Sequence, residues 1–140
     1  MTITADGRVA IVAGGGAAGE GIGNGRAAAL LMAREGAQVV VVDRNGADGE
    51  RTAEMIMSEG GRASTITADV TSAEDCRQVV EHAVETHGGI DVLVNNVGVG
   101  SQGSVVETEE AAWNRVMRIN VNSAFLMAQA AVPHLSLIHI

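Results

Sequence analysis

The chain has 140 residues, with nine basic and 17 acidic side chains, a formal net charge of −8 and an isoelectric point of about 4.8. A composition that is 46% hydrophobic and 19% charged is typical of one globular domain and excludes a disordered chain. The basic residues are scattered arginines. This argues against nucleic acid and membrane partners, because both bind through clustered positive charge.

The cysteine count and the N-terminus indicate the compartment. Cys76 is the single cysteine, so no intrachain disulfide can form, and a reducing environment is expected. The N-terminus has no basic segment followed by a long apolar one, which predicts that no signal peptide is present. No apolar run reaches the length of a membrane span. We therefore expect a cytoplasmic protein.

Strand and helix patterns alternate along the chain. Strands are predicted at 8–13, 38–42, 63–67 and 91–94, and helices at 22–35, 48–59, 73–87, 109–117 and 118–132. Thr71 or Ser72 and then Thr108 are the predicted helix caps, and Pro133 is the predicted stop. The order predicts an α/β fold, a Rossmann-like doubly wound parallel sheet truncated after four strands with the order 3-2-1-4. Residues 1–134 would form this single dinucleotide-binding domain.

A glycine-rich turn follows the first predicted strand. Glycine allows the backbone to approach a ligand closely, and free N–H groups at the following helix start favour a pyrophosphate. Gly14, Gly16 and Gly19 form a G-x-G-x-x-G pattern, and the length of the turn leaves the phosphate contacts open by about two residues. The candidate cofactor-binding residues here are Gly15, Gly19, Gly21, Ile22 and Gly23.

An acidic residue ends the second predicted strand. Asp43 lies 20 residues after Gly23, where a carboxylate can accept hydrogen bonds from an adenosine ribose. The same carboxylate would repel a 2′-phosphate, so we expect NAD, with NADP as the less favoured cofactor. The neighbouring Arg44 could hold that phosphate and is a second candidate contact. The alternative is that this pair only forms a turn at the strand end.

Three further motifs, in order along the chain, resemble the short-chain dehydrogenase/reductase family. They are Ala68-Asp69-Val70, then Asn95-Asn96-Val97-Gly98, and then Trp113 followed by Asn120 and Phe125. The similarity covers residues 7–133. In that family, residues equivalent to Asp69 and Val70 contact adenine. The segment with Asn95, Val97 and Gly98 flanks a ribose of the cofactor. The residue equivalent to Asn120 lies in the catalytic site.

The family resemblance implies an enzyme that interconverts a small-molecule secondary alcohol and a ketone by hydride transfer, and a parent that is a homodimer or homotetramer. The family's proton donor is a Tyr paired with a Lys in Tyr-x-x-x-Lys, and the chain has neither residue type. We therefore expect the cofactor-binding portion of such an enzyme, itself inactive. Residues 135–140, Leu-Ser-Leu-Ile-His-Ile, match the translation of a common sequencing adapter, so we expect a non-native tail.

Two other classes compete with this interpretation. One is a non-enzymatic domain that senses NAD(P) without turnover. The other is a methyltransferase, which also uses a glycine-rich turn and an acid after its second strand. His82 and His87 are five residues apart, which is off the spacing of a helical metal pair, so no metal site is predicted.

Overall fold

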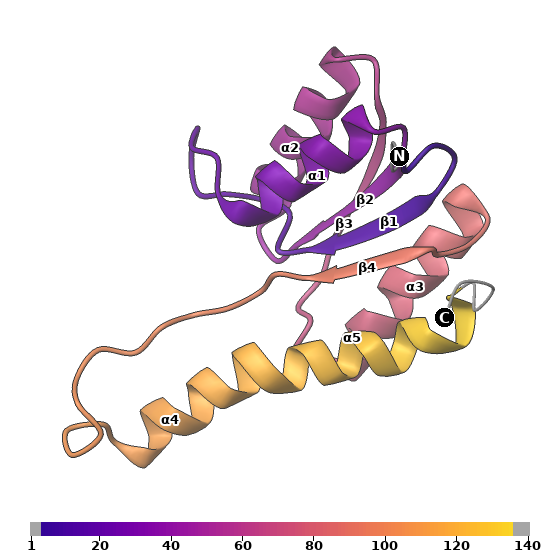
Figure 1. Cartoon of the computed structure of the whole chain (residues 1–140). Helices are drawn as coiled ribbons and strands as arrows, with labels where there is room; N and C mark the ends of the chain where they lie inside the picture. The colour runs from indigo at the N-terminus through magenta and orange to yellow at the C-terminus, as the bar shows by residue number, and fades with distance from the viewer. Residues whose placement is uncertain (1–3, 136–140) are drawn as a thin grey trace.

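The structure, a computed structural model, describes residues 4–135, and they form a parallel sheet with helices on both faces (Figure 1). The sheet order is β3-β2-β1-β4, which confirms the predicted topology. The strands are β1 (Val9–Ala13), β2 (Gln38–Asp43), β3 (Arg62–Thr67) and β4 (Val92–Asn95). The helices are α1 (Asn24–Arg34), α2 (Gly46–Ser58), α3 (Ala73–His87), α4 (Glu110–Met117), α5 (Ser123–Ala131), a π-helical η1 (Arg118–Asn122) and a 3₁₀ turn η2 (Val132–His134).

The two central strands are buried on both faces, which explains their continuous apolar sequences. Alternate residues of each strand serve the two faces. Ala10, Val12, Val39 and Val41 pack under α1 and α2. The opposite set packs with α3 and α5, and comprises Val9, Ile11, Ala13, Val40 and Val42. This sheet fixes the carboxyl ends of all four strands at one edge.

Helices α4, η1 and α5 run on from one another as a single rod, and α4 extends beyond the sheet (Figure 1). A long loop joins β4 to α4. None of the helices formed by residues 4–135 combines the length and the apolar character that crossing a bilayer requires.

Several predicted boundaries need correction. Helix α1 begins at Asn24 rather than at residue 22, because the glycine-rich turn continues to its N-cap, Gly23. The N-cap of α4 is Glu109 rather than Thr108, whose hydroxyl instead donates to the carbonyl of Ser104. Pro133 sits inside the 3₁₀ turn η2 and does not end the helical path at once.

The rod formed by α4, η1 and α5 carries a row of exposed apolar side chains. They follow one another at four-residue intervals and comprise Trp113, Met117, Val121 and Phe125. Trp113 is 57% exposed, whereas Met127 on the other side of the rod is fully buried. Of the predicted tail, residues 136–140 lie outside the described part. Leu135 forms a parallel bridge with Ile90.

Candidate cofactor site

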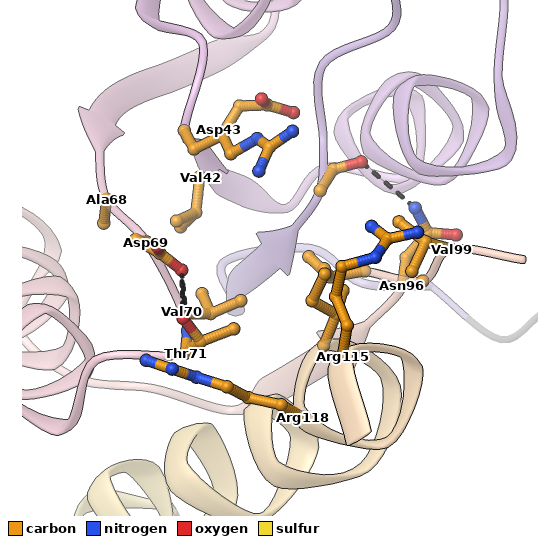
Figure 2. Close-up of a pocket in the computed structure, with 15 residues that line it drawn as sticks. Val42, Asp43, Ala68, Asp69, Val70, Thr71, Asn96, Val99, Arg115 and Arg118 are labelled. Carbon is orange, nitrogen blue, oxygen red and sulfur yellow. Dashed lines mark hydrogen bonds between the residues drawn. The ribbon is translucent and has the colours of Figure 1, made fainter. Parts of the chain in front are cut away.

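A cavity of about 550 Å³ lies at the carboxyl ends of the strands. In an open parallel sheet this is the place where ligands bind, at the point where the chain reverses its direction of winding. Figure 2 shows the lining side chains, which come from β2, from the loops after β1, β3 and β4, and from α4 and η1. They are Gly14, Val42, Asp43, Arg44, Ala68, Asp69, Val70, Thr71, Asn96, Val97, Gly98, Val99, Arg115, Arg118 and Ile119.

The carboxylate of Asp43 faces the glycine-rich turn. Its Oδ2 accepts from the amide N–H of Gly16 at 3.1 Å, and its Oδ1 accepts from the amide N–H of Asn45 at 2.9 Å. A Cβ at Gly16 would lie 2.7 Å from this Oδ2 and 2.8 Å from the Cβ of Asp48. Only glycine therefore allows the turn to come this close to β2.

The base of the turn is closed by a second tight contact. Gly14 has a φ of +73°, and a Cβ on Gly25 of α1 would lie 1.8 Å from the Gly14 carbonyl oxygen. Asn96, in the loop after β4, donates from Nδ2 to that same carbonyl oxygen at 3.1 Å. Strand β1, helix α1 and the loop after β4 thus meet at one point.

The predicted phosphate-binding residues fall into two groups. Gly15 is buried, and a Cβ there would lie 2.9 Å from Val41. Gly19, Gly21, Ile22 and Gly23 are exposed and do not line the cavity; Ile22 is 65% exposed. The residue pair in tight contact at the start of α1 is Gly14 with Gly25, and the predicted glycine pattern includes Gly14 but not Gly25.

Asp69 lines the cavity after β3, beside the buried Val70. Its Oδ1 accepts from the hydroxyl of Thr71 at 2.7 Å and from the Thr71 amide at 2.9 Å. These hydrogen bonds, with smaller contributions from Arg44 and Arg118, hold the pKa of the Asp69 carboxyl below its ordinary value. The group is therefore an ionised acceptor at neutral pH.

The segment after β4 is tied to the rod. Asn120, in the π-helical η1, accepts from the amide N–H of Val99 at 2.8 Å and donates to the Val99 carbonyl oxygen at 2.9 Å. Val97 and Gly98 line the cavity, whereas Asn95 does not and instead contacts the carbonyl oxygen of Ala124 at 3.5 Å. Short π-helical segments occur often at functional sites.

Three guanidinium groups surround the cavity. Arg44 follows Asp43 in the sequence and lines the cavity. Arg115 and Arg118 extend toward the cavity from the helical rod (Figure 2). The two latter residues were not among the predicted site residues. Their spacing of three places both on one side of a helix, a signal that could have identified them. The lining of the cavity therefore combines the carboxylates of Asp43 and Asp69 with three guanidinium groups.

This parallel sheet with a glycine-rich turn, and an acid at the end of β2, defines a Rossmann-like α/β domain. A family model for short chain dehydrogenases matches residues 8–138. The chain belongs to the short-chain dehydrogenase family.

Individual relatives agree with this assignment. The chain is 41% identical over 114 residues to 2-(S)-hydroxypropyl-CoM dehydrogenase 3 of Xanthobacter autotrophicus, covering 81% of this chain and 45% of the relative. A short-chain dehydrogenase/reductase from Burkholderia xenovorans superposes with a TM-score of 0.88 at 40% identity, covering 92% of this chain and 51% of that one. A 7α-hydroxysteroid dehydrogenase in complex with NADH and 7-oxo glycochenodeoxycholic acid gives a TM-score of 0.85 at 32% identity, covering 94% and 49%. The chain thus spans about half the length of these relatives.

Proposed function

We propose that the chain is the NAD(P)-binding portion of an oxidoreductase that interconverts a secondary alcohol and a ketone by hydride transfer. The observation that carries the proposal is the position of the Asp43 carboxylate, fixed by two amide donors between the glycine-rich turn and the cavity. A carboxylate has about four acceptor sites, so two remain for ribose hydroxyls.

The residues present fit a dinucleotide. The space that a Cβ would fill at Gly14 is lined by Val97 and Asn96, with atoms 3.0–3.3 Å away, so side chains are excluded where backbone and ligand would meet. The first turn of α1 contains no acidic side chain, and among the described residues no side chain caps it, so its amide N–H groups can face a pyrophosphate. Asp43 would hold the adenosine ribose, Asp69 and Val70 the adenine, and Val97 and Gly98 the second ribose. Asn95 would not touch the cofactor and would hold the segment after β4 against the rod through its contact with Ala124.

NAD is the proposed cofactor. Asp43 carries a negative charge where the 2′-phosphate of NADP would lie, and ionised Asp69 is close by. Arg44 is beside Asp43 and would attract the phosphate, so the two side chains compete. The fixed hydrogen bonds of Asp43 favour the ribose hydroxyls over the phosphate, since the carboxylate cannot turn away without giving up both amide donors.

The proposed role of the chain is binding without turnover. When NAD is bound, it supplies hydride transfer, but the family's proton donor is a Tyr assisted by a Lys, and the chain contains neither. Asn120 is the proposed contribution to the catalytic site, through the π-helical segment that it occupies. The proposed compartment is the cytoplasm, where the buried Cys76 would stay reduced. The proposed partners are an alcohol or ketone substrate and a second copy of the chain, which would cover the exposed apolar row on the rod.

The test is titration of the chain with NADH, NADPH and S-adenosylmethionine by isothermal titration calorimetry. We expect binding of NADH, weaker binding of NADPH and no binding of S-adenosylmethionine. Asp43→Asn keeps the size of the side chain and removes its charge. It should lower the affinity for NADH by about tenfold and reduce the difference in affinity between NADH and NADPH. Glu110→Gln on α4 is the matched control, because Glu110 does not line the cavity. Binding of S-adenosylmethionine without NADH would refute the proposal.

A further inference from the structure

The glycine-rich turn is built around one buried arginine. Arg26, in the first turn of α1, is fully buried, which is rare for an arginine. Its Nε donates to the hydroxyl of Thr52 at 2.9 Å. Its two terminal nitrogens donate to four backbone carbonyl oxygens at 2.6–3.2 Å, those of Ala17, Gly19, Gly21 and Asp48.

The carbonyl groups bound at this centre alternate along the turn. Those of residues 17, 19 and 21 bind the guanidinium directly. That of Gly15 accepts from the hydroxyl of Thr52 at 2.8 Å, and Thr52, also fully buried, accepts in turn from Arg26. The carbonyl groups of every second residue from 15 to 21 therefore point inward, toward one buried cluster.

The N–H groups of the turn are left for another partner. Within the described residues 4–135, no acceptor pairs with the amide N–H groups of residues 17–23. Residues 18–24 are exposed. A run of free amide donors held in one conformation is suited to a phosphate group. At the tip of the turn, the exposed side chain of Glu20 forms an ion pair with Arg51 of α2 at 3.1 Å.

Among residues 4–135, Arg26 forms no ion pair. Across the part of the chain that the structure describes, no carboxylate lies within ion-pair distance of its guanidinium, which is surrounded by carbonyl and hydroxyl oxygens. A buried charge without an opposite charge is unfavourable. An anion bound on the outer side of the turn would compensate for it.

We propose that Arg26, through Thr52, is the positioning residue that presents the turn's amide groups to the diphosphate of the cofactor and adds positive charge beneath it. This inference rests on the proposed function. Arg26 does not touch the ligand. It holds the carbonyl groups inward, and the diphosphate supplies the negative charge that the buried guanidinium lacks.

The test compares two ligands that differ only in the diphosphate, ADP and adenosine, by calorimetric titration of the whole chain. Arg26→Met should lower the affinity for ADP by about tenfold or more and change the affinity for adenosine by less than about twofold. Arg34→Met, on the same helix, removes an exposed pair with Glu59 and should change neither affinity. A purely structural role would weaken both ligands equally.

A milder pair of variants covers the case in which Arg26→Met fails to fold, as judged by circular dichroism. Thr52→Val removes the hydroxyl that links Arg26 to Gly15 at nearly constant volume, and Thr52→Ser retains it. Thr52→Val should lower the affinity for ADP but not for adenosine, and Thr52→Ser should retain the ADP affinity of the unaltered chain. Equal loss of both ligands, or no loss, overturns the inference while the proposed function stands. Failure of the unaltered chain to bind either ADP or NADH overturns both.

Discussion

The contact between Gly25 and Gly14 gives the sharpest prediction of stability. Gly25→Ala places a Cβ 1.8 Å from the Gly14 carbonyl oxygen, 2.6 Å from Asn96 Nδ2 and 2.8 Å from the Gly14 carbonyl carbon. A relaxed contact needs about 3.4 Å or more. Helix α1 or the turn must therefore move by more than about 1 Å. Because two of the three atoms belong to the backbone, a side-chain rotation alone cannot relieve the clash.

The size of the effect follows from this overlap. Overpacking of a buried site costs about 1–3 kcal/mol, and the better helix propensity of Ala returns at most about 1 kcal/mol. An overlap this severe belongs at the upper end of that cost, so the net loss is about 2 kcal/mol. For a chain of this length, 1 kcal/mol corresponds to about 3–5 °C, so we expect the melting temperature to fall by about 6–10 °C. The movement also disturbs the amide groups at the start of α1, so NADH affinity should fall by about tenfold.

The assay is thermal unfolding by circular dichroism together with NADH titration. Gly89→Ala is the matched control, because its added Cβ meets no atom within 4 Å and its φ is not in the left-handed region. The control should melt within about 2 °C of the unaltered chain. If Gly25→Ala melted like the control and bound NADH normally, the tight packing of α1 against the turn would be refuted.

Three further outcomes are expected. Burial, reinforced by His82 and Arg62, lowers the pKa of His87 below 6.5, so the unfolded chain binds more protons just below that pH. The contribution of neutral His87 to the free energy of unfolding is then fully present above about pH 6.5 and declines as the pH falls. His87→Asn should therefore reduce the difference in urea midpoint between about pH 7.5 and 5.5. An unchanged difference contradicts the assignment. Asn120→Ala removes both hydrogen bonds to the Val99 backbone, so amide exchange at Val99 should accelerate by about tenfold, whereas exchange at Val41 should not change. Burial also raises the pKa of Cys76 to about 11, so the native thiol should react with Ellman's reagent at least about a hundred times more slowly than in urea; equal rates would show that α3 is open.

The sheet could be predicted because its signals are local. The run Val39–Val42 is β-branched throughout and is buried on both faces, as its pattern indicated. Helix α3 carries the predicted acidic first turn, and Ser72 caps it by accepting from the Asp75 amide. The start of α1 was displaced by two residues because Gly23 caps it without a side chain, so no residue type marks the boundary.

The site was harder to predict because its contacts join distant segments. Asp43 was predicted from its place at the end of a strand and Asp69 from the family resemblance, and both line the cavity. The tight contact of Gly25 with Gly14 arises because α1 crosses over Gly14. The spacing of the glycines along the sequence does not predict that contact. The burial of Arg26 also depends on Thr52 of α2, 26 residues away. An arginine after a glycine turn would ordinarily be assigned to the surface.

The central claim is that the turn after β1 and Asp43 together hold a dinucleotide. Amide chemical-shift mapping by NMR of the labelled chain during titration with NADH tests it most directly. We predict the largest changes at residues 14–26 and 43–45. Changes confined to the groove between α3 and α5, which is lined by Arg77, Glu81 and Gln129, or no changes at all, would contradict the account.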